Sequence, residues 1–388
     1  MNKTVVNNLG LLDWDFKEIS TKEIFPHNIC WYPSRYIPQI PAMLINELSN
    51  TGDRVLDPFC GSGTTLIESA RLNRPCVGID INPLATFMTN VKIELLGELD
   101  FHINDLLQVI DNAELRLCNK EQYLVFSNDS IPYSNIEELR GWFHETTLSQ
   151  LFSIWSCIED EDGHLKDVLK LLFISILMPC SGLETKKPYT YYADKVKPKD
   201  NVLFKDAMSL FKSRMERVVI GLSKRHSTLN VTDTYCENKN IDEFDFSTYG
   251  MFDLIVTSPP YLSVTDYSTG FRLAHLWYNF SDSIDNAKSK EIGARWKRKR
   301  SNSYQEYMTS MRNFVNKVSE VMNDDAFLCL VIGESAKYQG KVIEPLSEWM
   351  EKELGLKRQI SKERSVNQNY FIHPTGGVKK EEILVLRR

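Results

Sequence analysis

The sequence predicts an α/β protein with a doubly wound sheet that is interrupted by a mainly helical insertion. Residues 53–96 follow the order strand, glycine turn, helix, strand, helix, which opens such a sheet. Residues 100–228 carry apolar side chains mostly at helical spacing. Strand patterns resume at residue 229. We therefore expect one sheet domain built from residues 1–99 and 229–388, with residues 100–228 inserted into it.

The opening unit consists of short buried strands around a glycine turn. Residues 54–57 form an apolar strand, residues 60–63 the turn, and residues 64–72 a helix with one apolar face. A second buried strand covers residues 76–80. Pro83 then stands where the first turn of a helix tolerates proline, because the N–H group that proline lacks has no partner there. The turn is thus expected at the carboxyl end of the first strand.

The remaining elements follow in order. In the insertion, helices are expected at residues 136–143, 148–158, 165–178 and 202–222, and residues 181–200 break the helical pattern with prolines, lysines and tyrosines. The sheet continues with strands at 229–231, 252–257 and 327–332, helices at 304–322 and 342–354, and final strands near 356–361 and 382–386. A hairpin-like connection between the last two strands predicts a mixed sheet with an antiparallel edge.

Composition excludes several classes of protein. The chain has 388 residues and a net charge of −6, which argues against indiscriminate coating of nucleic acid but permits a local basic face. Its eight cysteines form no CxxC pair and no cluster with histidine, so we expect reduced thiols and no metal site. The longest apolar runs are too short to span a bilayer. We therefore expect a soluble, cytoplasmic protein without a membrane partner.

Residues 57–65, Asp-Pro-Phe-Cys-Gly-Ser-Gly-Thr-Thr, form a candidate ligand-binding loop. Glycines let the backbone approach a ligand closely, and the N–H groups that begin the next helix can hold an anion. Many nucleotide-binding folds have such a turn. Asp80, at the tip of the next strand, makes the prediction more specific, because an acid there accepts hydrogen bonds from ribose hydroxyls. The alternative is that Asp80 caps the helix before Pro83.

Residues 257–261, Thr-Ser-Pro-Pro-Tyr, directly follow the strand that ends at residue 256. Proline has no N–H, so carbonyl oxygens in this loop are left to accept hydrogen bonds. The amino group of a base is a poor nucleophile because its lone pair is delocalised into the ring. Acceptors at Ser258 Oγ and the Pro259 carbonyl would bind its two hydrogens, and Tyr261 would stack on a base taken out of the duplex. The alternative is a proline turn beside a core tyrosine.

Together the two loops resemble those of the amino-methyltransferases that make N4-methylcytosine or N6-methyladenine in DNA. Further segments are similar to parts of that family or of a bacterial subgroup of it, namely residues 27–44, 78–84, 141–144 with Ser181, 231–233, 331–335 and 380–386. The resemblance implies a Rossmann-like methyltransferase sheet of seven strands with helices on both faces. It also implies S-adenosylmethionine as cofactor, direct methyl transfer without a covalent enzyme intermediate, and double-stranded DNA with a flipped target base as substrate.

The resemblance also assigns roles to individual residues. Catalysis is expected from Ser258, Pro259, Pro260 and Tyr261. One further acid, Asp233, is expected to meet the adenine amino group of the cofactor. The full set of expected cofactor contacts is Tyr32, Pro33, Asp57, Pro58, Phe59, Cys60, Gly61, Gly63, Thr64, Thr65, Asp80, Ile81 and Asp233.

The target base is only partly indicated by the loop. Serine in place of aspartate before Pro-Pro-Tyr favours cytosine N4, but both side chains can accept from either amine, so adenine N6 remains the alternative. Pro179-Cys180 is a pair that elsewhere marks cytosine C5 methylation through a cysteine nucleophile. It follows a helix inside the insertion and not a sheet strand, so we assign it to structure. The order of the two motifs is similar to the arrangement in which target recognition lies between them.

Two basic segments are candidates for contacts with DNA phosphates. Residues 294–300 form the densest positive run, which supplies Arg295, Lys297, Arg298 and Arg300 beside the catalytic loop. In residues 186–192, Lys186 and Lys187 precede interleaved tyrosines, which can combine phosphate contact with stacking. The alternatives are a solvated surface helix for the first segment and tyrosines that pack a loop onto the insertion for the second.

Several other functions compete with this prediction. An RNA amino-methyltransferase would share the chemistry, but only about fifty residues precede the cofactor motif, too few for most RNA-binding domains. Protein glutamine methylation would favour Asn over Ser258, and a dehydrogenase would need a third glycine after Gly61 and Gly63. Both loops are intact, which argues against a non-catalytic DNA-binding subunit. We therefore expect a site-specific DNA methyltransferase of a restriction–modification or phage-defence system, with a cognate restriction endonuclease as a further partner.

Overall fold

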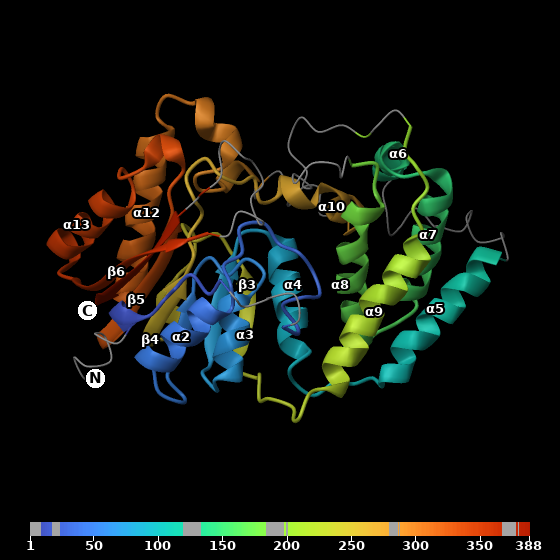
Figure 1. The fold of residues 1–388 in the computed structure, drawn as a ribbon, viewed down its shortest axis with the longest axis horizontal. Helices are drawn as coiled ribbons and strands as arrows, with labels where there is room; N and C mark the ends of the chain where they lie inside the picture. Colours follow the sequence, from blue (N-terminus) through green and yellow to red (C-terminus); the bar gives the residue numbers. More distant parts are fainter. Residues whose placement is uncertain are drawn as a thin grey trace.

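The computed structural model describes residues 9–17, 24–118, 133–183, 198, 201–278, 286, 288–366, 378 and 380–388. In it, a seven-stranded sheet with helices on both faces lies beside a cluster of further helices (Figure 1). This arrangement confirms the predicted doubly wound α/β sheet with its mainly helical insertion.

Five strands of the sheet run parallel and the last two form an antiparallel edge. The order across the sheet is β3-β2-β1-β4-β5-β7-β6. Strand β7 runs antiparallel to both of its neighbours, which confirms the predicted mixed sheet. The strands are β1 (Val55–Asp57), β2 (Cys76–Asp80), β3 (Thr234–Asn238), β4 (Phe252–Thr257), β5 (Met322–Gly333), β6 (Lys357–Ser365) and β7 (Lys380–Arg387).

The order of the strands reverses at β1. From β1 the chain passes to β2 and β3 on one side, and it later returns to place β4 on the other side. In a doubly wound sheet, ligands bind outside the carboxyl ends of the strands at such a reversal. Leu56 of β1 pairs with Ile255 of β4, so the loops that follow these two strands start side by side. The two sequence motifs occupy those loops.

The strands alternate between two apolar cores. Val55 contributes to the core under α2, α3 and the end of α4, and its neighbour Leu56 contributes to the core under α12 and α13. This is the alternation expected of a strand buried on both faces. Each fully buried aliphatic side chain contributes about 1.5–3 kcal/mol relative to an exposed one, so a slip in register would be costly. The covering helices are α2 (Gln39–Leu48), α3 (Thr64–Arg71), α4 (Pro83–Glu94), α12 (Ser303–Glu320) and α13 (Ile343–Leu354).

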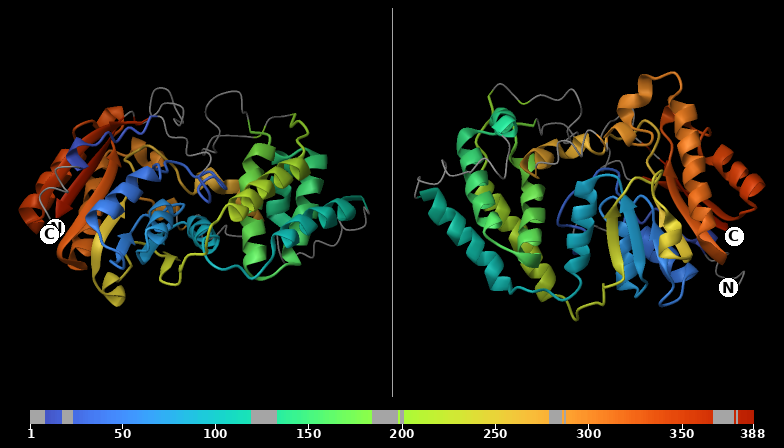
Figure 2. Two further views of the ribbon diagram at one scale, coloured as in Figure 1. Left: turned by 60° about the horizontal axis from the view of Figure 1, so that its bottom comes forward. Right: turned by 180° about the vertical axis from the view of Figure 1, so that it is seen from behind.

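A third core lies among the helices beside the sheet, which we call the helical body (Figure 2). One of its members, α10, comes from the far half of the chain, shortly after β4. Trp277 of α10 is fully buried, with its ring centroid 4.9 Å from that of Phe173 and 5.0 Å from that of Phe152. The loop after β4 is therefore tied into the helical body. The members are α5 (Ile103–Cys118), α6 (Tyr133–Trp142), α7 (Glu145–Glu159), α8 (Gly163–Cys180), α9 (Ala207–Ser223) and α10 (Arg272–Tyr278).

The structure bears on two further expectations, the strand at residues 229–231 and the structural role of Pro179-Cys180. The strand predicted at residues 229–231 is wrong, because β3 begins at Thr234. Leu229 belongs instead to the connection, where its N–H donates to the Leu96 carbonyl at 2.8 Å. Pro179 lies in the last turn of α8, and Cys180 is buried in the helical body, away from the sheet. Within the described ranges, no helix has the length and apolar character that crossing a membrane requires.

Candidate active site

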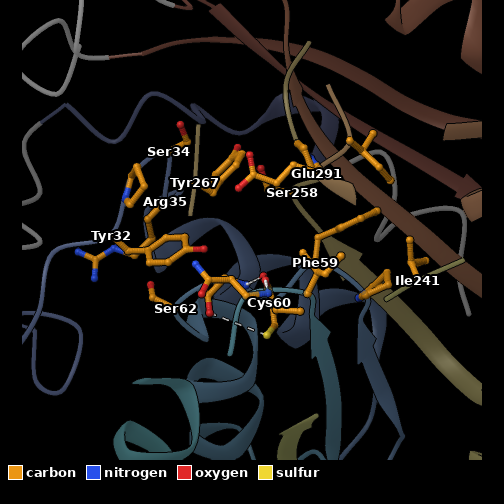
Figure 3. A pocket seen from close by; sticks show the side chains of 18 of the residues that line it. Tyr32, Ser34, Arg35, Phe59, Cys60, Ser62, Ile241, Ser258, Tyr267 and Glu291 are labelled. Carbon is orange, nitrogen blue, oxygen red and sulfur yellow. Dashed lines mark hydrogen bonds between the residues drawn. The ribbon is translucent and has the colours of Figure 1, made fainter. Parts of the chain in front are cut away.

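A cavity opens at the carboxyl ends of β1, β2 and β4 (Figure 3). It encloses about 840 Å³, including the space at its mouth. Its wall contains residues of both sequence motifs, from the glycine loop after β1 and from the proline loop after β4. The expected site residues that line it are Tyr32, Pro33, Pro58, Phe59, Cys60, Gly61, Thr64, Asp80, Ile81, Ser258 and Pro260. The structure thus brings most of the predicted cofactor contacts and half of the catalytic loop to one place.

The glycine loop is held close to its neighbours by two glycines with left-handed backbone. Gly61 has φ +51° and Gly63 has φ +81°, a region that residues with a side chain rarely adopt. A Cβ atom on Gly63 would lie only 2.6 Å from Thr89 Cγ2, and one on Gly61 only 3.1 Å from the Tyr32 ring. Helix α3 begins directly afterwards, at Thr64, so its first N–H groups lie beside the cavity wall.

Asp80 points its carboxyl group at the glycine loop from the tip of β2. One oxygen accepts the Gly61 N–H at 2.9 Å, and the other accepts the Asn82 N–H at 2.8 Å. Burial raises the pKa of Asp80 to about 6. The cap of the next helix is Asn82, whose side chain accepts the Leu84 N–H at 3.0 Å. Asp80 therefore keeps lone pairs for ribose hydroxyls, and the helix-cap alternative belongs to its neighbour.

Asp57 joins the two motif loops and does not line the cavity. Its carboxyl group accepts the Thr257 hydroxyl at 2.6 Å, the Thr65 hydroxyl at 2.5 Å and the Phe59 N–H at 3.1 Å. Gly63 and Thr65 are likewise absent from the lining. Asp57 and Thr65 are engaged by the protein itself, so the structure gives them a supporting position, and the expected cofactor contacts of the three residues stay predictions.

Asp233 lies at the wrong end of β3 for a cofactor contact. It immediately precedes the first residue of β3, it is exposed, and its carbonyl accepts the Cys76 N–H at 3.2 Å. The cavity is at the opposite, carboxyl end, where Asn240 and Ile241 line it. The expectation for Asp233 is therefore wrong, and the error follows from placing the strand five residues too early.

Ser258 presents its hydroxyl group at the cavity wall. Its Oγ lies 3.1 Å from the Val331 carbonyl, to which it donates, and 3.1 Å from the Tyr261 hydroxyl. A serine hydroxyl has one proton and two lone pairs, so donation to Val331 leaves acceptor capacity. The Pro260 carbonyl already accepts the Tyr307 hydroxyl at 2.9 Å. Ser258 thus offers a hydrogen-bond acceptor to a ligand in the cavity.

Tyr261 is packed behind the loop and does not form an open stacking surface. Only 4% of it is exposed, and its hydroxyl donates to Glu381 Oε1 at 2.9 Å. Burial also raises the pKa of this hydroxyl, so it stays protonated. Neither Tyr261 nor Pro259 lines the cavity, whereas Tyr267 and Tyr32 do, with ring centroids 6.4 Å apart. The expected stacking role of Tyr261 is therefore corrected, because Tyr267 and Tyr32 supply the aromatic wall.

The donor set of the cavity fits S-adenosylmethionine. Ser62 Oγ and Asn82 Nδ2 are buried without a hydrogen-bond partner among the described residues, which marks the wall as prepared for a polar ligand. Phe59 and Ile241 form an apolar side of the cavity suited to an adenine ring (Figure 3). Arg35, also in the wall, suits the carboxylate of the methionine part. Among the described residues, no group of three or more histidine, cysteine or acidic side chains could hold a metal ion.

The basic segment after the proline loop is anchored to the site. The Arg295 N–H donates to the Thr265 carbonyl at 3.2 Å, and the Trp296 N–H donates to Asp266 Oδ1 at 2.9 Å. The Lys297 ammonium donates to the Glu291 carbonyl at 2.6 Å. Arg298 and Arg300 are exposed beyond it. The segment, which we call the basic rim, begins with a short helix and is thus tied to the connection that carries Glu291 into the cavity wall. Lys186 and Lys187 lie outside the described residues.

Twelve residues of the cavity wall were not among the expected site residues, and three of them show why. Arg35 lies within the segment at 27–44 that resembles the family, so its region was indicated but not the residue. Asn240 follows the tip of β3, and a correct strand register would have identified it. Glu291 has no sequence signal, because it reaches the cavity from a connection between α10 and α12.

Comparison with known proteins agrees with this geometry. The model of a family described as DNA methylase matches residues 9–87 and 252–388, which include both loops. A Type II methyltransferase, M.MjaII from Methanocaldococcus jannaschii, is 21% identical over 96% of this chain and 84% of its own. M.MvaI from Kocuria varians, also a Type II methyltransferase, is 24% identical over 69% of this chain and 60% of its own. A tRNA (guanine(10)-N2)-dimethyltransferase from Methanothermobacter thermautotrophicus is 36% identical, but over only 24% of this chain and 27% of its own.

Proposed function

The chain belongs to the DNA methylase family of S-adenosylmethionine-dependent amino-methyltransferases, and from that premise we propose that it methylates cytosine N4 at a specific DNA sequence. We place this activity in a restriction–modification or phage-defence system, with a cognate endonuclease as partner, because two relatives carry the name Type II methyltransferase. The alternative target is adenine N6, which needs the same chemistry.

The observation that carries the proposal is the shared cavity. The glycine loop and Asp80 form one end, and Ser258 lies at the other end beside Tyr267 (Figure 3). A methyl donor held by the first group would face an amine held by the second. Direct transfer needs the reacting atoms about 3–3.5 Å apart and aligned, which a single cavity with rigid walls provides.

Some residues of the cavity bind the methyl donor and the base, and Ser258 activates the target amine. S-adenosylmethionine, when bound, supplies a methyl group on a positively charged sulfur. Asp80 accepts the ribose hydroxyls and so fixes the depth of the donor. Ser258 accepts one hydrogen of the target amine, which lowers delocalisation of its lone pair into the ring. Tyr267 stacks against the flipped base and excludes water from it, and Tyr32 lies against Gly61 at the cofactor end. The DNA-facing rim, Arg295 to Arg300, holds the phosphates around the flipped nucleotide.

The proposal predicts N4-methylcytosine as the product. Purified protein is incubated with genomic DNA and S-adenosylmethionine that carries an isotopically labelled methyl group, and the nucleosides are analysed by mass spectrometry. We expect label in N4-methylcytosine, because a neutral serine acceptor favours that base. Sequencing of the methylated DNA then gives the target sequence.

Other labelled products would contradict either the proposed base or the proposed DNA substrate. Label in N6-methyladenine would keep the mechanism and overturn the base. The partial match to a tRNA methyltransferase makes RNA the second candidate, so total tRNA is tested in parallel. Label in RNA alone would contradict the proposed DNA substrate.

The basic rim predicts a loss of DNA affinity when its exposed charges are removed. The double variant R298A/K299A removes two exposed cations next to the cavity. The slope of log affinity against log salt is negative, and each lost phosphate contact is expected to reduce its magnitude by about 0.9. The slope of the double variant should therefore be smaller in magnitude by roughly 1.8. The measurement is fluorescence anisotropy of a labelled duplex at several salt concentrations.

A matched control uses two cations far from the cavity. K352A/K357A changes exposed lysines at the end of α13 and the start of β6, at the amino ends of the parallel strands and so at the opposite end from the cavity. This variant should bind DNA with the wild-type salt slope. Equal slopes for all three proteins would contradict the assignment of residues 295–300 to DNA.

A further inference from the structure

Glu291 is a buried carboxyl group at the catalytic end of the cavity, in the connection between α10 and α12. Only 4% of it is exposed. Its Oε1 accepts two hydrogen bonds from Ser268, from the N–H at 2.7 Å and from the hydroxyl at 2.6 Å. Its Oε2 is buried and receives no hydrogen bond from any described residue. Figure 3 shows Glu291, Ser258 and Tyr267 together at the end of the cavity away from Cys60 and Ser62.

The surroundings of Glu291 favour its neutral form. The pKa of Glu291 is raised to about 7, chiefly by burial and also by the nearby acids Asp266 and Asp80, against the opposing effect of the two bonds from Ser268. Lys297 donates its hydrogen bond to the main-chain carbonyl of Glu291, and its charge also interacts with the carboxyl group, which favours the ionised form. Oε1 already accepts two hydrogen bonds, whereas Oε2 accepts none and can donate a hydrogen bond when it carries the proton. Tyr267 and Tyr32 are themselves neutral, because burial raises the pKa of each.

We propose that neutral Glu291 donates from Oε2 to the ring nitrogen beside the exocyclic amine of the flipped base, and that this contact selects cytosine or adenine over guanine. This inference rests on the proposed function, in which Ser258 holds the amine of the same base. The ring nitrogen is the next polar atom along the edge of the base, and Glu291 and Ser258 line the same end of the cavity.

The chemistry of the bases gives the contact its selectivity. Beside its amine, cytosine carries the acceptor N3 and adenine the acceptor N1, so both complement a carboxylic acid. Guanine carries the donor N1–H on the Watson–Crick side of its amine, so in the same orientation it would place two donors against each other at Glu291. A site that hydrogen-bonds one edge rejects a mismatched edge strongly, because buried polar groups are then left unpaired. An ionised Glu291 would reverse this preference and accept from guanine.

The test compares a glutamine with a leucine at this position. E291Q keeps an oxygen for Ser268 and a permanent N–H donor for the base, so we expect single-turnover methylation within about threefold of wild type. E291L keeps the size but removes both functions, and we expect a loss of about tenfold or more. The rates are measured at saturating cofactor on the duplex identified by sequencing. A dead E291Q with an active wild type would overturn the inference, because it would show that the group must ionise.

The dependence on pH separates the two forms of Glu291. With a folded pKa of about 7, the neutral donor is present below that pH and is lost as the pH rises through it. The methylation rate of the wild type should therefore fall above about pH 7, whereas the rate of E291Q should show no such decrease. Saturating cofactor removes the contribution of Asp80 to binding. An identical alkaline limb in both proteins would also overturn the inference.

Two further readouts do not depend on turnover. The wild-type minus E291Q infrared difference spectrum at pH 6 should contain the carbonyl stretch of a protonated carboxylic acid, and its absence would contradict a neutral Glu291. A duplex with 3-deazacytosine or 1-deazaadenine at the target lacks the ring acceptor, so it should bind wild type about tenfold more weakly and E291L unchanged. An equal loss for both proteins would contradict the contact. If wild type methylates no nucleic acid, the proposed function fails, whereas an active wild type with these negative results fails only the role of Glu291.

Discussion

S258A is expected to lower the rate of methyl transfer by two to three orders of magnitude while cofactor affinity stays within about threefold of wild type. The loss follows from the geometry of Ser258, whose hydroxyl donates to the Val331 carbonyl and keeps its lone pairs for the target amine. Removing one preorganised polar partner of a reacting group typically costs about 10²–10³ in rate. Single-turnover methylation and calorimetric binding of S-adenosylhomocysteine measure the two quantities separately.

S258D distinguishes an acceptor role from a packing role. A carboxylate keeps the acceptor function at the same position, so this variant should recover part of the activity that alanine loses. If alanine and aspartate variants were equally inactive, Ser258 would matter for the shape of the loop and not for its hydrogen bond. A large loss of cofactor affinity in S258A would point to the same conclusion.

D57A is expected to destabilise the fold, and D80A to abolish cofactor binding with a much smaller effect on stability. Asp57 is buried and accepts hydrogen bonds from Thr257, Thr65 and Phe59. Its loss leaves the Thr257 hydroxyl and the Phe59 N–H without this partner, and leaves Thr65 with the Val256 carbonyl at 3.3 Å. Breaking such a network costs about 3–5 kcal/mol in the free energy of unfolding. Asp80 accepts only two backbone N–H groups, and its remaining lone pairs face the cavity. Urea unfolding and calorimetry of cofactor binding give the two effects.

The loss in free energy of unfolding caused by D57A should depend on pH and be larger at low pH. Burial raises the pKa of Asp57 to about 6, above the value of 3.8 for an unperturbed carboxyl. The unfolded chain therefore ionises first as the pH rises, and the stability contributed by the neutral group is lost through about pH 6. The destabilisation is expected to be larger at pH 5 than at pH 8. Equal stability losses in D57A and D80A at pH 5 would contradict the division of roles between them.

Local motifs allowed much of the cofactor site to be predicted from the sequence. A glycine turn between a strand and a helix has few structural outcomes, so Gly61, Thr64 and Asp80 could be placed without coordinates. Ser258 could be predicted in the same way, because it directly follows an apolar strand. These residues act where their own strand ends, and strand ends can be read from hydrophobic periodicity.

The errors arose where position depends on packing between distant segments. A short apolar run at residues 229–231 was taken for β3, and the shift moved the expected acid to the wrong end of the strand. The burial of Tyr261 depends on Glu381 at the opposite end of the chain, and the function of Glu291 depends on Ser268 and the cavity. Single-sequence patterns contain no information on such contacts.

The pairing of β1 with β4 has a consequence for how the protein is made. Val55 pairs with Cys76 of β2 on one side and with Leu254 of β4 on the other, so one edge of β1 waits for a partner about two hundred residues later in synthesis. The whole helical body except α10 leaves the ribosome in that interval. Pairings of such high contact order form slowly, and an unpaired strand edge invites association with other chains. Slow translation and low temperature during expression should therefore favour soluble protein, because they allow the helical body to fold before the sheet closes around β1.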